Sequence, residues 1–217
     1  MNIAVLGTGE VGQSLATGLA KAGHTVTLGS RTADNAAAAE WAAGTGGRHG
    51  TFADAAASAE VIVNATSGLV SVEALTAAGA DNLAGKVLVD VANPLDFSGG
   101  FPPRVATFDE GISLAEHIQR TFPDARVVKT LCTVNNAVMV DPARVPGTHN
   151  VFLSGDDRDA KKVTGGLLGD LGWTLDQIID LGGLPTARPI EQNILMWLAL
   201  SQALGTYDFN ISVQRAD

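Results

Sequence analysis

The feature that most constrains this chain is a glycine-rich turn near its N-terminus, between an apolar segment and an Ala/Leu-rich one. Residues 2–6 form a short apolar run, which predicts a β-strand. The turn itself reads Gly7-Thr8-Gly9-Glu10-Val11-Gly12. Residues 11–22 predict a helix that ends before Gly23, where a left-handed C-cap is expected. A G-x-G-x-x-G sequence between a strand and a helix is typical of dinucleotide-binding βαβ units.

The three glycines of this turn have different physical roles. Gly7 permits a tight turn, Gly9 lets the backbone approach a pyrophosphate, and Gly12 lets the helix pack closely against the strand. The helix N-terminus contributes free N–H groups and a partial positive charge, and both favour phosphate. The turn therefore predicts a pyrophosphate site.

The end of the next predicted strand, residues 25–28, indicates which dinucleotide is bound. An NAD site usually carries Asp or Glu there, which binds the ribose 2′-hydroxyl. This chain has Gly29-Ser30-Arg31-Thr32 instead. Two hydroxyls and a guanidinium can bind a 2′-phosphate, which a carboxylate would repel. Arg31 alone would be an ordinary solvated residue, but between Ser30 and Thr32 it predicts a preference for NADP over NAD.

The composition argues against several classes of function. A formal charge of −9 disfavours nucleic acid or an anionic membrane as the main partner. No apolar run reaches the length of about 18 residues that a transmembrane helix needs, and no signal peptide is expected. The single cysteine, Cys132, excludes an internal disulfide and is typical of a cytoplasmic protein. The spacing of His, Cys and carboxylates indicates no metal site.

Strands and helices are predicted to alternate as far as residue 130. The apolar runs at 61–64, 86–91 and 126–130 are typical of strands covered on both faces. The other expected elements are a strand near 50–52, helices at 35–43, 53–59, 71–80 and 113–122, and a loop at 95–104. This alternation predicts an α/β fold, a Rossmann-type doubly wound parallel sheet.

A break at 143–147 is the best candidate for a domain boundary. We therefore expect a dinucleotide-binding domain at 1–147 and a small C-terminal α+β domain at 148–217, which closes the acceptor cleft and mediates dimerisation. The elements expected in the second domain are strands at 150–153 and 173–179 and helices at 156–171 and 189–204. The last helix is strongly apolar, and either a dimer interface or plain core packing would explain that.

Ligands of open α/β sheets lie outside the carboxyl ends of the strands. This rule selects the strand-end segments 8–11, 30–32, 65–68, 92–94 and 130–136. Ala65, Thr66, Asn93 and Pro94 are expected beside the adenosine–nicotinamide half of the crevice, although Asn93-Pro94 is equally well explained as a turn.

The sequence shows no evident catalytic acid. The Tyr-x-x-x-Lys pair of short-chain reductases is absent, because Ile211 lies four residues after Tyr207, the single tyrosine. Lys129 is the best single candidate, but a solvated lysine is the preferred interpretation, and Cys132 is expected to be a small buried hydrophobe. Reduction of a carbonyl needs a proton donor. Hydride transfer to a flavin-like ring does not, so an NADP site without an acid favours a cofactor-like acceptor.

Three segments, residues 7–12, Gly-His-Thr-Val at 23–26 and Gly29-Ser30-Arg31, resemble the coenzyme F420-dependent NADP oxidoreductase family. The reductase domain of six-transmembrane metalloreductases shares the pattern, and the resemblance extends more weakly to residues 127–130 and 152–157. It implies a Rossmann domain, a small C-terminal domain, a homodimer, and hydride exchange between NADP(H) and a 5-deazaflavin. By this likeness the NADP contacts would come from Thr8, Gly9, Glu10, Val11, Ser30 and Arg31.

The chain departs from the family where a second basic residue often follows the Ser-Arg pair. Thr32 and Asn35 stand there, which implies a weaker grip on the 2′-phosphate. We predict a cytoplasmic NADP(H)-dependent oxidoreductase with coenzyme F420 or a flavin as acceptor, acting as a homodimer. Two alternatives remain open: an NADPH-dependent reductase of a small carbonyl or imine, and a redox sensor that binds NADPH without turnover.

Overall fold

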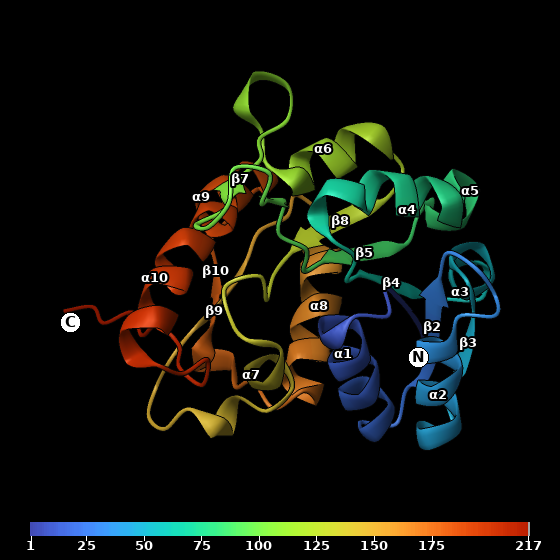
Figure 1. Cartoon of the computed structure of the whole chain (residues 1–217), viewed down its shortest axis with the longest axis horizontal. Coiled ribbons are helices and arrows are strands. Elements are labelled where there is room, and N and C mark those ends of the chain that lie inside the picture. The colour runs from blue at the N-terminus through green and yellow to red at the C-terminus, as the bar shows by residue number, and fades with distance from the viewer. Residues whose placement is uncertain (217) are drawn as a thin grey trace.

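The computed structural model describes residues 1–216, and its centre is a six-stranded parallel sheet (Figure 1). The strand order is β3-β2-β1-β4-β5-β8. These strands are β1 (Asn2–Leu6), β2 (Thr25–Ser30), β3 (Arg48–Thr51), β4 (Val61–Asn64), β5 (Val87–Asp90) and β8 (Arg126–Lys129). The order reverses between β1 and β4, and this reversal creates the crevice in which doubly wound sheets bind ligands.

Helices cover both faces of the sheet, as the unbroken apolar character of its central strands requires. The helices are α1 (Glu10–Lys21), α2 (Ala36–Thr45), α3 (Phe52–Ala57), α4 (Ser71–Ala78), α5 (Ala80–Leu83), α6 (Leu114–Thr121), α7 (Asn136–Val140), α8 (Arg158–Asp170), α9 (Ala187–Gln192) and α10 (Ile194–Leu204). One hydrophobic cluster joins α1, α2 and α8 to one face, and a second joins α3, α4 and α6 to the other. The predicted α/β class is confirmed.

The C-terminal elements continue this core. Helix α8 packs against the sheet, with Leu167 and Leu168 buried in the same cluster as Val89 and Val128. Strands β9 (Val151–Leu153) and β10 (Ile178–Asp180) form a separate parallel pair. This pair approaches β8 through an antiparallel bridge between Ser154 and Lys129. Helices α9 and α10, red in Figure 1, follow, and α9 lies against α6.

Three expectations for the elements are wrong. The strand expected at 173–179 begins later, because Thr174 caps a short 3₁₀ turn at Leu175–Gln177 before β10. The single helix expected at 189–204 is two helices, α9 and α10, separated at Asn193. The loop at 95–104 contains a small antiparallel hairpin, in which β6 (Leu95–Asp96) pairs with β7 (Arg104–Val105). No helix within residues 1–216 is long and apolar enough to cross a membrane.

The close approach at Gly12 gives a test of the turn. A Cβ added there would lie 1.9 Å from the Gly7 carbonyl oxygen, whereas one added at Gly166 in α8 would meet nothing within 4 Å. Gly12→Ala should therefore lower the free energy of unfolding by about 2 kcal/mol or more, measured by urea denaturation. Gly166→Ala, the matched control, should raise it by about 0.5–1 kcal/mol. Equal effects of the two variants would contradict the close packing.

Candidate active site

Two cavities lie side by side over the carboxyl ends of the strands. The larger has a volume of ≈ 470 Å³ and the smaller of ≈ 260 Å³. Ala65 and Thr66, which follow β4, line both. The larger cavity is also lined by Gly7, Thr8, Gly9, Ser30, Arg31, Asn35, Phe52, Ser67, Val70, Glu73, Ala74 and Ala77. The smaller is also lined by Glu10, Val11, Val91, Ala92, Asn93, Cys132, Val134, Asn135, Asn136, Met139, Ile194 and Trp197.

The glycine turn forms one end of the larger cavity, and its backbone needs glycine. Gly7 has φ +119°, and a Cβ there would lie 2.5 Å from the Ala65 carbonyl oxygen. The space that a Cβ would occupy at Gly9 is open to 4 Å. Gly9 is the N-cap of α1 and no side chain caps the helix, so the first N–H groups of α1 are available to an anion. The turn is thus shaped to receive a pyrophosphate.

Arg31 also lines the larger cavity and comes just after β2. It is exposed, and within the described part of the chain it forms no ion pair. Ser30 is buried, and its hydroxyl donates to the Thr32 carbonyl oxygen at 2.6 Å. Asn35 caps α2 by accepting from the Ala38 N–H at 3.0 Å. Ser30 and Asn35 therefore shape the turn that presents the guanidinium of Arg31.

Most residues predicted for the nucleotide site come together around these cavities. Gly7, Thr8, Gly9, Ser30 and Arg31 line the larger one, and Glu10, Val11 and Asn93 line the smaller, with Ala65 and Thr66 shared. Gly12, Thr32 and Pro94 lie outside both linings. These three residues belong to the turns that carry the lining residues.

A row of polar residues crosses the sheet below the smaller cavity. Asn64, Asp90 and Lys129 are the last residues of β4, β5 and β8, and the strand register pairs each with the next. All three are fully buried. Asn64 Nδ2 donates to Asp90 Oδ1 at 2.8 Å, and Lys129 Nζ lies 2.8 Å from Asp90 Oδ2. The row is therefore one continuous polar network.

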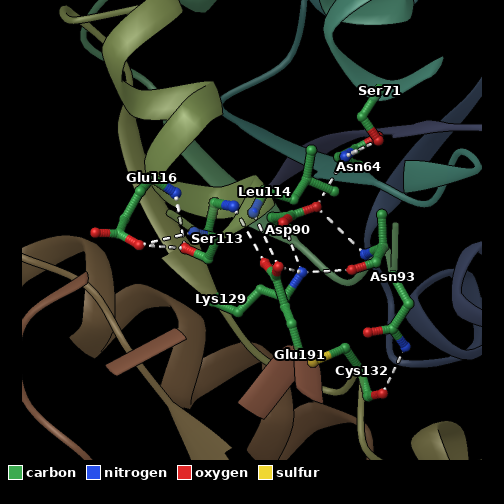
Figure 2. A network of polar contacts seen from close by, with 12 residues as sticks. Asn64, Ser71, Asp90, Asn93, Ser113, Leu114, Glu116, Lys129, Cys132 and Glu191 are labelled. Carbon is green, nitrogen blue, oxygen red and sulfur yellow. Dashed lines mark hydrogen bonds and ion pairs between the residues drawn. The ribbon is translucent and has the colours of Figure 1, made fainter. Parts of the chain in front are cut away.

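The expectation that Lys129 is a solvated lysine is wrong. Its ammonium donates hydrogen bonds to Asp90 Oδ2 and to the carbonyl oxygen of Ala92, and it forms an ion pair with Glu191 Oε1 at 3.1 Å (Figure 2). Burial alone would lower the pKa of Lys129, but the carboxylates of Asp90 and Glu191 raise it above its ordinary value. The charge of Lys129 is therefore stabilised inside the protein by two carboxylates and one carbonyl oxygen.

The network reaches the walls of the smaller cavity in two places. Asp90 Oδ1 accepts the Ala92 N–H at 3.2 Å, so both backbone polar groups of Ala92 are held by the network. Asn64 Oδ1 accepts the Thr66 hydroxyl at 2.7 Å. Ala92 and Thr66 both line the smaller cavity, so the network fixes part of its wall.

Cys132 is buried, as predicted, and it lines the smaller cavity. Burial raises the pKa of its thiol to about 12, so the side chain is a neutral thiol at physiological pH. Its carbonyl oxygen accepts from Asn93 Nδ2 at 2.7 Å. The thiol is therefore an uncharged part of the cavity wall and is not activated as a nucleophile.

Helix α9 is tied to the N-terminus of α6 by two acidic residues. Glu191 of α9 accepts the N–H groups of Leu114 at 2.8 Å and Ala115 at 3.2 Å. Glu116 of α6 is bound by Arg188 of α9, with two nitrogen–oxygen distances of 2.7 Å. The partial positive charge of the α6 N-terminus therefore stabilises the negative charge of Glu191, which lies beside Lys129.

The sequence analysis missed Asn64, Asp90 and Glu191. A signal existed for the first two, because the strand-end sequences VIVN, VLVD and VVK each close on a polar residue after an apolar run. In a parallel sheet such residues meet at one edge. Glu191 carries no local signal, since it lies on a short helix far along the chain.

The sheet order, the glycine turn and the strand-end cavities together define a Rossmann-type dinucleotide-binding protein. The family profile described as "NADP oxidoreductase coenzyme F420-dependent" matches residues 2–94. The F420-dependent NADP reductase of Methanothermobacter thermautotrophicus is 34% identical over 205 residues, which cover 88% of this chain and 85% of that protein. This chain belongs to the family of coenzyme F420-dependent NADP oxidoreductases, as the resemblance implied.

Two further similarities are informative. A crystal structure from Arthrobacter sp. FB24, provisionally named as an F420-dependent NADP reductase, has 50% identity and a TM-score of 0.93, covering 99% of this chain and 100% of that one. Metalloreductase STEAP3 of Rattus norvegicus is 30% identical over 200 residues. The match covers 87% of this chain but only 35% of that longer protein. The family profile and the F420-dependent NADP reductases together confirm the predicted class, an NADP-dependent oxidoreductase.

The residues present fit NADP. The open space at Gly9 and the uncapped α1 N-terminus suit a pyrophosphate. Arg31 supplies a positive charge on the wall of the larger cavity, where a 2′-phosphate needs one. Glu73 is the only carboxylate that lines the larger cavity among the described residues, and it comes from α4 rather than the end of β2. The acid typical of an NAD site is therefore absent from its usual place.

The ion pair between α6 and α9 predicts a pH dependence of stability. Partial burial opposes ionisation of Glu116, but hydrogen bonds from Arg188 and Ser113 lower its pKa from 4.5 to about 2. Since the folded-state pKa is depressed, this stabilisation is complete above the unfolded pKa and is lost as the pH falls through about 2. Arg188→Met should therefore show a shallower loss of unfolding free energy between pH 5 and pH 3 than the wild type, in urea titrations. Parallel curves for the two proteins would contradict this role.

Proposed function

We propose that this protein transfers a hydride between NADPH and the deazaflavin coenzyme F420. The observation that carries the proposal is the pair of cavities that share the Ala65–Thr66 wall. The larger fits the phosphate-bearing adenosine half of NADP, and the smaller fits the nicotinamide and the ring of the acceptor. The names of the relatives support F420 as that acceptor.

The proposed binding residues follow from the two linings. Gly7, Thr8, Gly9 and the N-terminus of α1 would hold the pyrophosphate, and Arg31 would hold the 2′-phosphate, on the turn shaped by Ser30 and Thr32. Ala65, Thr66 and Asn93 would flank the nicotinamide, with Glu10 and Val11 at the start of α1. Gly12 and Pro94 would fix the turns behind these contacts.

The smaller cavity can support hydride transfer without a protein acid. Its wall is largely apolar, with Val11, Val91, Val134, Met139 and Ile194. NADPH, when bound, supplies the hydride itself. The protein's contribution is to bind and orient the nicotinamide and the acceptor ring and to exclude water. An apolar, rigidly held wall can do both.

A panel of acceptors tests the proposal and its alternatives. We expect NADPH oxidation, followed at 340 nm, with F420 and much less with FMN, ferric chelates or small carbonyls and imines. Turnover of a carbonyl or imine alone would favour the reductase alternative. Tight NADPH binding without turnover of any acceptor would favour the redox-sensor alternative.

Arg31 is the residue on which the preference for NADP should depend. Arg31→Glu removes a charge-assisted hydrogen bond to the 2′-phosphate, worth about 1.5–3 kcal/mol, and adds repulsion. The ratio of kcat/KM for NADPH over NADH should fall by about 10- to 100-fold. Arg48→Glu makes the same charge change at an exposed residue outside both cavities and should leave the ratio unchanged. A loss in both variants would indicate a general electrostatic effect.

We also propose a homodimer, with α10 at the interface, in the reducing cytoplasm. Helix α10 is apolar on nearly all sides, yet Leu195, Met196 and Leu204 are exposed in the single chain. Helices of this kind are normally covered on every face. The division into domains at 1–147 and 148–217 also stays a proposal, with α8 packed on the sheet as the link between the two.

A charge placed on α10 tests the interface. Met196→Lys should convert a dimer to a monomer in sedimentation velocity, because a buried ammonium without a partner is costly. Leu175→Lys changes an apolar residue that is 88% exposed and lies on the turn before β10, and it should remain dimeric. A monomeric wild type would refute the proposed dimer.

A further inference from the structure

We infer that Glu191 is a positioning residue for the smaller cavity, which it shapes from two sides. Through Lys129 it fixes the Ala92 wall, and through α9 it holds α10 as the opposing wall. The inference rests on the proposed function, because it concerns the same site. Glu191 itself takes no part in the proposed hydride transfer.

Glu191 is fastened to two elements that are distant in the sequence. The residue is 1% exposed, and its Oε1 lies 3.1 Å from Lys129 Nζ at the end of β8. The same carboxylate accepts the N–H groups of Leu114 and Ala115 at the start of α6. Glu191 thereby fixes α9 relative to both the sheet and α6 (Figure 2).

The first wall is held through Lys129. Its ammonium donates to the Ala92 carbonyl oxygen, and Asp90, its other ionic partner, accepts the Ala92 N–H. The neighbouring Asn93 is held by its own bond to the Cys132 carbonyl oxygen. A change in the position of Lys129 therefore moves the backbone that lines the cavity.

The second wall is held through the helix that carries Glu191. Helix α9 is followed at once by α10, and the Asn193 N–H between them donates to the Pro189 carbonyl oxygen at 3.1 Å. Ile194 and Trp197 of α10 line the smaller cavity. The Trp197 ring is stacked on Phe209, with ring centroids 5.6 Å apart. Glu191 is therefore connected to both walls, to one through Lys129 and to the other through its own helix.

A buried ion cluster contributes little to the free energy of folding, but it can fix the relative positions of the groups that form it. Apolar residues of similar size often stabilise a protein as well or better than buried ion pairs. Here, however, two hydrogen bonds and an ion pair to one ammonium restrain the positions of Lys129, Asp90, Ala92 and Glu191. Hydride transfer needs this precision, because a misplacement of about 1 Å can cost about 100-fold in rate.

The variant Glu191→Gln tests the inference, with Arg188→Met as its matched control. The glutamine keeps the size of the side chain and removes its charge, while Lys129 retains Asp90 as an ionic partner. The control removes the other polar tie between α9 and α6 and leaves Glu191 untouched. For each protein we would measure the Kd of 2′,5′-ADP, the fluorescence emission of bound NADPH, and kcat with F420.

We expect Glu191→Gln to bind 2′,5′-ADP within about twofold of the wild type, since the larger cavity is intact. Its bound NADPH should emit more like NADPH in water, and its kcat should fall at least about 10-fold. Arg188→Met should retain the emission and the kcat of the wild type. If Glu191→Gln does not fold, Glu191→Asp, which keeps the charge on a shorter side chain, should show the same changes.

Two results would overturn the inference: wild-type emission and kcat in the Glu191 variant, or equal losses in both variants, which would make its role merely structural. Failure of the proposed function has a different signature. A wild-type protein that binds no 2′,5′-ADP lacks the NADP site itself. A wild type that binds NADPH but does not reduce F420 either uses another acceptor or is the redox sensor of the second alternative. The emission comparison still decides the role of Glu191.

Discussion

The site is organised around the buried ammonium of Lys129, which forms ion pairs with two carboxylates. The charges of this cluster must be compensated, because uncompensated charges in the interior would destabilise the fold. Asp90 and Glu191 together carry one more charge than Lys129 neutralises. The N-terminus of α6 offsets the excess by donating two N–H groups to Glu191, and Asn64 donates to Asp90. Each carboxylate oxygen of Asp90 and Glu191 therefore has a partner. Without such partners, the burial of each of these charges would cost on the order of several kcal/mol of folding free energy.

The parallel sheet explains why this cluster lies beneath a ligand site. Neighbouring parallel strands end at a common edge, so one polar residue at the end of each strand forms a row across the sheet. The loops that leave this edge line the two cavities. The row thus joins the rigid sheet to the loops, which are otherwise the least constrained parts of such a fold. Rigid walls are the contribution that a protein can make when the reacting groups belong to its ligands.

The residues that line the larger cavity were mostly predictable from the sequence, because their signals are local. The turn at residues 7–12, the β2 end with Arg31 and the apolar central strands each depend on a few adjacent residues. The burial of Lys129 was not predictable in the same way, because it depends on Glu191, which belongs to a distant helix. The division between α9 and α10 was missed for a related reason: a continuous apolar run hides the change at Asn193, whose position follows from the tertiary anchoring of α9.

The two cavities differ in how much of the chain they require. The lining of the larger one is complete by residue 77, whereas that of the smaller one extends to Trp197. The lining of the larger cavity therefore comes from the N-terminal third of the chain, whereas the lining of the smaller one is brought together from the N-terminal turn, the strand ends and helix α10. The shape of the smaller cavity consequently depends on tertiary packing across most of the chain, and that of the larger one depends mainly on local turns.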